Sequence, residues 1–384
     1  MTQFCSVFQQ LLKLFPRSEF DGLVKKHSAE RHARGFSSWD QFVAMEFCQL
    51  GRAQSLREIC DGLASMEGKT RHLGIDTPKR STLAYANEHR PWQLFESVFN
   101  NLLGRVRSSL NLGHRFRFKN PLMSMDASVI DLCLNTFDWA SYKRRKGAIK
   151  LHMLLDHVGL LPVFCVITDG KVHEINIARG LSFAPGTIVV FDRGYVDYDW
   201  FRHLTNEKVW FVTRLRENAQ YEVVEELATT RPHVISDQVI ELKKASKYGF
   251  EPLRLRRVVI QLPGEETMEF FTNNFRLAAA TIAEIYRDRW QIESFFKTIK
   301  QNLRIKTFVG TSANAVRTQI WSAMIAILIL KFLQLSSSRN WSLSHLVALI
   351  RMHLFSYHDL WKWLDDPFDT SPPAAAPQLT LQFG

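Results

Sequence analysis

The chain has 384 residues, of which 46% are hydrophobic and 23% charged, the profile of a folded soluble protein with two or three structural units. Its 49 lysines and arginines outnumber its 38 aspartates and glutamates, which gives a formal net charge of +11. This surplus fits a polyanionic partner and a merely solvated basic surface equally well.

Three features exclude other classes of protein. The five cysteines include no C-x-x-C pair, which argues against a disulfide framework or a zinc site and fits a reducing cytoplasm. The first residues lack the basic region and the long apolar run of a secretory signal. The most apolar stretch, 324–330, is far shorter than a membrane span, so we expect a buried helix there and no membrane partner.

The first third of the chain is predicted to be all-α, over residues 1–118. Phe, Leu and Trp recur there at helical spacings with few β-branched runs. Ser37 or Ser38 is expected to cap one helix and Ser55 the next. Residues 77–82, TPKRST, should open a further helix whose Ser/Thr cap and basic neighbours suit phosphate, although a plain helical bundle explains the pattern equally well.

The pattern changes after residue 118. Short runs rich in Val and Ile predict strands at 123–134, 150–155, 161–168, 187–191 and 210–215, with helices near 174–181 and 197–207. Three early strands followed by alternating helix and strand indicate a mixed α/β sheet flanked by helices.

The second half is expected to interrupt this sheet and then complete the domain. Residues 216–275 predict further strands, at 234–242, 253–262 and 268–272, and hence a β-rich insertion. A long helix should follow from 281 to about 303, with more helices to about 355. We therefore expect a core made of 119–215 and 276–355, and a partly disordered tail over 356–384.

The predicted helix 282–304 carries the strongest local signal. One side of it collects polar residues suited to a metal or a phosphate: Tyr286, Arg289, Glu293 and Lys300, with Lys297 and Arg304 beside them. At 100° per residue the first four share a sector of about 60°. A solvated amphipathic helix with a Glu293–Lys297 pair is the simpler interpretation. However, a carboxylate among cations suits a metal ion beside a phosphodiester better than it suits stability.

Two aspartates complete a possible metal site. Asp126 lies in an otherwise apolar strand, where a charge must be paired or metal-bound. Asp192 ends another strand, at the edge where open α/β sheets place ligands. Each alone could be a capping or turn residue. Together with Glu293 they offer three hard oxygen ligands, which suit Mg²⁺.

These residues carry a resemblance to a known family. Tyr286, Arg289, Glu293 and Lys300 match the Y-x2-R-x3-E-x6-K signature of the bacterial cut-and-paste insertion-sequence transposases that have a DDE triad. The D-A-S sequence at Asp126, D-R-G-Y at 192–195 and F-V-T-R-L at 211–215 fall where that family has its two aspartates and the following strand. The resemblance covers about residues 120–335. It implies an RNase H-like fold with a β insertion between the second aspartate and the glutamate.

The resemblance also implies roles for the residues. Asp126, Asp192 and Glu293, here called the DDE triad, would hold two Mg²⁺ ions, for which Mn²⁺ can substitute. The other signature side chains, Tyr286, Arg289 and Lys300, would contact transposon-end phosphates. Trp290 would either stack on DNA or pack. Rival carboxylates lack the signature spacing: Asp131, Asp138, Asp156 and Asp169.

The implied activity is metal-dependent cleavage at transposon ends and strand transfer into target DNA. One partner would be double-stranded DNA, comprising the inverted-repeat ends of the transposon and the target. The other would be a second copy of the chain, in a synaptic homodimer. Cleavage would pass through a hairpin at the transposon end. The basic run Lys143, Arg144, Arg145 and Lys146 either follows DNA phosphates or is an ordinary solvated turn. Two alternatives remain open: a related nuclease that does not transpose, and an inactive, domesticated DNA-binding derivative.

Overall fold

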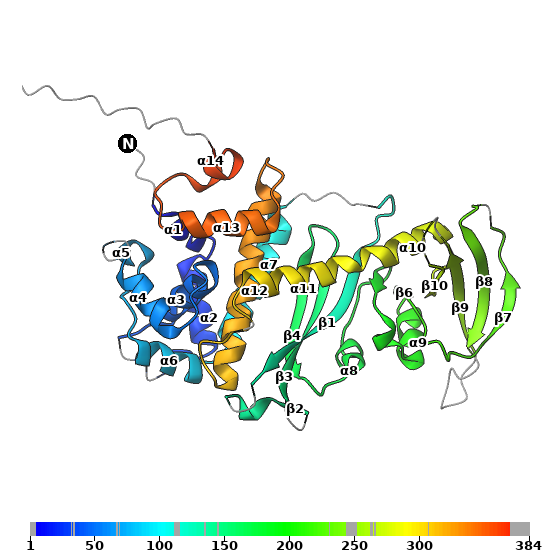
Figure 1. Ribbon diagram of the computed structural model, residues 1–384, viewed down its shortest axis with the longest axis horizontal. Coiled ribbons are helices and arrows are strands. Elements are labelled where there is room, and N and C mark those ends of the chain that lie inside the picture. Colours follow the sequence, from blue (N-terminus) through cyan, green and yellow to red (C-terminus); the bar gives the residue numbers. More distant parts are fainter. Residues whose placement is uncertain are drawn as a thin grey trace, which may run out of the picture.

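The computed structural model consists of an N-terminal block of helices, one long sheet, and C-terminal helices that run back from the sheet to the N-terminal block (Figure 1). The N-terminal helices lie at one end of the molecule and the last strands of the sheet at the other. The structure describes residues 5–31, 33, 35–66, 68, 70–110, 116–133, 136–143, 146–229, 231–242, 252–261, 264, 266–305 and 307–368.

The described part of the N-terminal block is helical, as predicted. Its helices are α1 (Val7–Leu12), α2 (Arg17–Lys26), α3 (Ser38–Leu50), α4 (Leu56–Ala64), α5 (Thr70–Leu73), α6 (Arg80–His89) and α7 (Gln93–Ser109). Two predicted serine caps are confirmed. Ser37 caps α3 in a reciprocal capping box with Asp40, and Ser55 accepts a hydrogen bond from the first turn of α4.

The Ser/Thr cap predicted within 77–82 is wrong. Helix α6 begins at Arg80 behind Lys79, and no side chain caps it. Ser81 and Thr82 lie inside the first turn, so the start of this helix presents basic side chains rather than a hydroxyl cap.

Helix α12 (Ala313–Ser336) forms the centre of the core. It is the one helix in the described ranges that is long and apolar enough to cross a membrane, but 83% of its most apolar window is buried inside the protein. The predicted buried helix at 324–330 is therefore part of a longer one. Because α12 packs against α3, α6 and α7, the N-terminal and C-terminal helices share one hydrophobic cluster with a face of the sheet.

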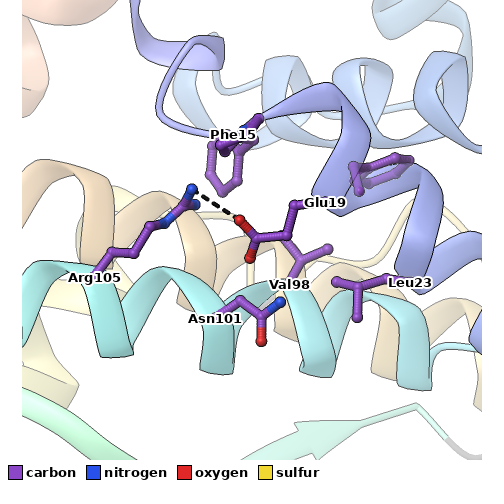
Figure 2. A pocket seen from close by; sticks show the side chains of 8 residues that line it. Phe15, Glu19, Leu23, Val98, Asn101 and Arg105 are labelled. Carbon is purple, nitrogen blue, oxygen red and sulfur yellow. Dashed lines mark hydrogen bonds and ion pairs between the residues drawn. The ribbon is translucent and has the colours of Figure 1, made fainter.

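A small hollow separates α2 from α7 (Figure 2). The Arg105 guanidinium meets the Glu19 carboxylate across it, with Nη1 and Oε2 3.1 Å apart, beside Phe15 and Leu23. Both charged side chains are more than a third exposed, so this ion pair adds little stability. The cavity volume of about 10 Å³ is roughly that of one water probe, which makes it a packing gap rather than a ligand site.

Glu46 on α3 is an acidic residue inside this core. It is fully buried, neither carboxylate oxygen has a hydrogen-bond partner among the described residues, and burial raises the pKa of this carboxyl well above its usual range. The folded protein therefore keeps a proton that the unfolded chain releases. Stability contributed by this group is present at pH 4 and declines as the pH rises towards the folded pKa.

Glu46→Gln should remove this decline. We expect the variant to gain at least about 1 kcal/mol over the wild type in free energy of unfolding between pH 5 and pH 8, because one pKa unit corresponds to about 1.4 kcal/mol. Urea unfolding of both proteins at the two pH values measures the difference. Parallel pH profiles would show that Glu46 does not hold the proton.

The sheet has ten strands in the described ranges. They are β1 (Leu122–Leu132), β2 (Ser141–Lys143), β3 (Lys146–Asp156), β4 (Leu161–Asp169), β5 (Ile188–Val190), β6 (Trp210–Thr213), β7 (Tyr221–Glu226), β8 (Val234–Leu242), β9 (Leu253–Ile260) and β10 (Met268–Thr272). Strand β3 pairs antiparallel with β1 and β4, while β1, β5 and β6 run parallel. This is the RNase H-like mixed α/β arrangement that was predicted.

The β-rich insertion continues the same sheet. Strand β10 pairs antiparallel with β6, placing Thr272 opposite Val212, and β9, β8 and β7 follow outward. Strand β7 was not predicted, because its sequence YEVVEE is almost wholly exposed at the sheet edge and shows no apolar alternation. The insertion and the first part of the sheet are thus hydrogen-bonded into one layer.

Helices cover both faces of the sheet. Helices α8 (Glu174–Ala178) and α9 (Tyr198–Asn206) pack with Met125 of β1 on one face, whereas Ile130 and Leu132 belong to the cluster shared with α11 and α12 on the other. Alternate residues of β1 thus point to opposite faces. Asp126 has the same parity as Ile130 and therefore points to the α11 face.

The predicted single helix over 281–303 is wrong in detail. It is two helices, α10 (Ala279–Asp288) and α11 (Trp290–Asn302), which run along the sheet in line with each other (Figure 1). At the junction the Arg289 N–H donates to Tyr286 O and the Ile292 N–H to Arg289 O, both three-residue spacings that tighten the turn. Arg289 is therefore a junction residue.

The predicted partly disordered tail, 356–384, begins with ordered structure. Beyond α13 (Leu343–His353), Tyr357 forms a β-bridge with Ser6 near the N-terminus. Helix α14 (Leu360–Asp365) then buries two leucines in the core. The rest of the predicted tail, 369–384, lies outside the described residues.

Candidate active site

Asp126 lies in the middle of β1 and is partly buried. Its Oδ1 accepts a hydrogen bond of 2.8 Å from the Ala127 N–H. Burial raises the pKa of this carboxyl to about 7, and the negative charges of Asp192 and Glu293 raise it further against the opposing effect of Arg289. The three triad carboxylates come from distant segments, yet Asp192 and Glu293 lie close enough to Asp126 to raise its pKa.

Asp192 directly follows β5 and caps the short 3₁₀ turn Arg193–Tyr195. Its Oδ1 accepts a hydrogen bond of 2.9 Å from the Gly194 N–H. A Cβ atom added at residue 194 would lie 2.9 Å from that same oxygen, closer than ordinary contacts allow. Glycine at this position leaves the space in which the Asp192 carboxylate is held.

Glu293 lies on α11 and is paired with Arg289, the Nη2 and Oε1 atoms being 2.7 Å apart. The Arg289 guanidinium is buried, lies 5.4 Å from the Tyr286 ring, and keeps its Nε without a hydrogen-bond partner among the described residues. Tyr286 in turn packs on Phe270 of β10. Tyr286, Arg289 and Glu293, three of the four signature residues, therefore form one contiguous cluster, in line with the predicted sharing of one helix sector.

Lys300 joins this surface to the sheet. Its Nζ donates a hydrogen bond of 2.9 Å to the Val129 carbonyl on β1, the strand that carries Asp126. Trp290 is 62% exposed, so it does not pack in the core, and the Arg289 guanidinium lies 5.8 Å from its ring. Lys297 is exposed.

The placement predicted for Arg304 is wrong. Helix α11 ends at Asn302, and the Arg304 side chain donates two hydrogen bonds to the Arg52 carbonyl, 2.8 and 3.1 Å long. It joins the turn after α11 to the turn after α3. Of the basic run between β2 and β3, Arg144 and Arg145 lie outside the described residues, and only the backbones of Lys143 and Lys146 are described.

The chemistry of the donor set fits a hard divalent cation. In the part of the chain that is described, no three His, Cys, Asp or Glu side chains stand close enough together to bind one ion as they are. Glu293 is turned towards Arg289 instead. Nevertheless, Asp192 and Glu293 raise the pKa of Asp126, so the three carboxylates together concentrate negative charge that a divalent cation would neutralise.

A basic cavity next to the triad was missed by sequence reasoning. Its volume is about 570 Å³, within the usual size of ligand pockets. It is lined by charged and aromatic side chains: Arg193, Arg214, Arg216, Glu217, Tyr221, Glu269 and Phe271. Arg193 follows Asp192 in the chain. Burial raises the pKa of Tyr286, and the positive charge of Arg214 acts against this rise, so Arg214 lies near the signature residues. The arginines come from two turns after separate strands, so no sequence spacing brings them together.

Comparison with known proteins identifies the family. A family model described as transposase DDE domain matches residues 117–329, which include all ten strands, both halves of the signature helix and the triad. The chain belongs to the DDE transposase family. A second family model, a domain of unknown function called DUF4372, matches residues 4–76 of the transposase.

Individual relatives agree with this family. The transposase is 33% identical over 261 residues to a putative transposase, y4zB, of Sinorhizobium fredii, covering 66% of this chain and 71% of the relative. It is 30% identical over 254 residues to the probable transposase for insertion sequence element IS5377 of Geobacillus stearothermophilus, covering 64% of this chain and 67% of that one. A solved piggyBac transposase synaptic complex with hairpin DNA is similar at a TM-score of 0.43 and 10% identity, covering 96% of this chain and 86% of that one.

The transposase is thus an enzyme of DNA transposition, a catalyst of DNA cleavage and strand transfer.

Proposed function

We propose that Asp126, Asp192 and Glu293 are the catalytic, metal-binding carboxylates of an insertion-sequence transposase that cuts DNA at its own inverted-repeat ends. The observation that carries the proposal is their convergence from β1, the end of β5 and α11, together with the Arg289–Glu293 ion pair. Two divalent cations bound there would activate a water or a 3′-hydroxyl and stabilise the leaving oxygen.

The remaining signature residues would hold the DNA. Glu293 cannot pair fully with Arg289 and also bind a cation, so the guanidinium would become available to phosphate oxygens in a two-pronged contact. Tyr286 lies under this guanidinium and keeps it in place. Lys300, held near β1, adds a second positive charge. The basic cavity lined by Arg193, Arg214 and Arg216 would extend this surface along the bound strand.

The N-terminal helices offer a separate surface for DNA. The exposed face of α6 carries Tyr85 and His89, whose rings are stacked 4.0 Å apart, and Arg80 is exposed at the first position of the helix. The opposite face is fixed in the core through Leu83 and Asn87. A rigid helix that presents a cation and an aromatic pair suits contact with a duplex. We propose this region as the part that binds the transposon ends.

The test is excision in vitro. Purified transposase with Mg²⁺ should cut a duplex that ends in the element's inverted repeats and should join the freed 3′ end to a target plasmid. Cleavage without joining would favour the nuclease alternative, and DNA binding without cleavage the domesticated one. Hairpin ends on a denaturing gel would support the proposed hairpin route. A complex of two protein chains with two DNA ends, measured by light scattering, would support the proposed homodimer.

Binding of the cation should depend on pH through Asp126. Only the ionised carboxyl binds a metal, and its pKa is about 7, so protonation competes with the cation below that pH. We expect the Kd of the metal-free protein for Mn²⁺ to weaken by roughly fivefold from pH 7 to pH 6, and to change little above pH 8. Electron paramagnetic resonance of free Mn²⁺ measures it. A pH-independent Kd would contradict the assignment of Asp126.

A further inference from the structure

Ser124, His157 and Asp288 form a buried chain of hydrogen bonds beside the triad. The Ser124 Oγ and His157 Nε2 atoms are 2.6 Å apart, and His157 Nδ1 and Asp288 Oδ2 are 2.8 Å apart. Ser124 is completely buried, and the His157 and Asp288 side chains are 4% and 5% exposed. The three residues come from β1, from the turn after β3 and from the last position of α10.

The order Ser–His–Asp is that of an acyl-transfer triad, but it cannot work as one here. Such a serine must reach a substrate carbonyl, and Ser124 has no exposed surface. His157 is fixed further by its own backbone, since its N–H donates a hydrogen bond of 3.0 Å to the Leu122 carbonyl on β1. The chain of bonds therefore acts as a tether between secondary-structure elements.

The two ends of the tether lie on the two sides of the active site. Ser124 is two residues from Asp126 on β1 and points to the same face of the sheet. Asp288 immediately precedes Arg289, the junction residue of α10 and α11, which pairs with Glu293. Through His157 the strand that carries one triad carboxylate is bonded to the junction that orients another.

We propose that His157 is a positioning residue that sets the distance between Asp126 and the Arg289–Glu293 pair, and so determines how well the triad binds its cations. The inference rests on the proposed function of the triad. Without the tether the junction can shift relative to β1, and displacements of about 1 Å at a catalytic site can cost on the order of a hundredfold in rate.

The experiment compares Mn²⁺ binding by the full-length protein with cleavage of end DNA. His157→Phe keeps a ring of similar shape and removes both nitrogens; it should weaken Mn²⁺ binding by at least about tenfold and slow cleavage at saturating DNA. Ser124→Ala cuts only the strand end of the tether and should have a smaller effect. Asp288→Asn keeps an oxygen to accept from His157 and should retain near-normal Mn²⁺ affinity, whereas Asp288→Leu should not.

A destabilised control separates positioning from folding. Leu360→Ala empties a buried site on α14, away from the sheet, and should lower the melting temperature while leaving the Mn²⁺ Kd unchanged. Wild-type Mn²⁺ affinity in His157→Phe would overturn the proposal, as would a wild type that binds no Mn²⁺. A wild type that binds Mn²⁺ but cuts no end DNA would instead refute the proposed function, and the Mn²⁺ comparison would still decide the role of His157.

Discussion

Asp126→Asn, Asp192→Asn and Glu293→Gln should each slow cleavage of transposon-end DNA by about a thousandfold or more. Each change keeps the shape of the side chain and removes a hard anionic ligand, and loss of a preorganised electrostatic group at a reacting centre has costs of this size. The measurement is the single-turnover rate of end cleavage with Mg²⁺. Binding of end DNA should persist in all three variants.

Stability and activity should move in opposite directions at Asp126. Burial and its acidic neighbours hold the pKa of this carboxyl at about 7, so its charge is unfavourable in the metal-free protein. Asp126→Asn should therefore melt no lower than the wild type at pH 8 without metal. Asp131→Asn, at an exposed position of the same strand, is the matched control and should cut normally. Normal cutting by all three triad variants would refute the assignment.

Arg256→Met should be the most destabilising single change in the insertion, costing about 3–5 kcal/mol of unfolding free energy. The Arg256 side chain is buried and pairs with the buried Asp237 carboxylate through two bonds, of 2.8 and 2.7 Å. A third bond, of 2.6 Å, reaches the Leu277 carbonyl in the segment that leads into α10. The substitution leaves the Asp237 charge buried and unpaired, which is the main source of the cost.

The same two strands provide the control. Arg254 and Glu241 are paired at 2.8 Å, but the arginine is 65% exposed. Arg254→Met should therefore cost less than about 1 kcal/mol. The double variant Arg256→Met with Asp237→Leu should recover much of the loss, because the unpaired charge is gone. Urea unfolding of the four proteins measures these differences, and equal losses in the two single variants would contradict the explanation.

The sequence predicted those features that depend on local geometry. Helical spacing placed Tyr286, Arg289 and Glu293 together, and they do lie together, because α10 and α11 continue in line across the tight turn at Arg289. Ser37 and Ser55 were recognised as caps for the same reason. Apolar runs likewise placed the buried strands to within a few residues.

The features that were missed depend on tertiary contacts. No glycine or proline marks the end of α11 at Asn302. The following turn is instead held by Gln49 and Arg52 at the end of α3, which carries Arg304 away from the signature face. The chain of bonds from Ser124 through His157 to Asp288 joins positions 33 and 131 residues apart. Neither separation corresponds to the repeat of a helix or a strand, so no sequence pattern reveals this chain of hydrogen bonds.

The sharing of one core by the first and last helices has a consequence for synthesis of the protein. Helices α3 and α7 pack on α12, and α1 is bonded to the segment before α14, so the N-terminal block cannot bury its apolar faces until residues beyond 350 have left the ribosome. A prematurely ended chain would lack a folded N-terminal block. If this block binds the transposon ends, as we propose, such a chain could not occupy an end as an inactive competitor. On that proposal, the chain would acquire the ability to hold DNA together with the ability to cut it.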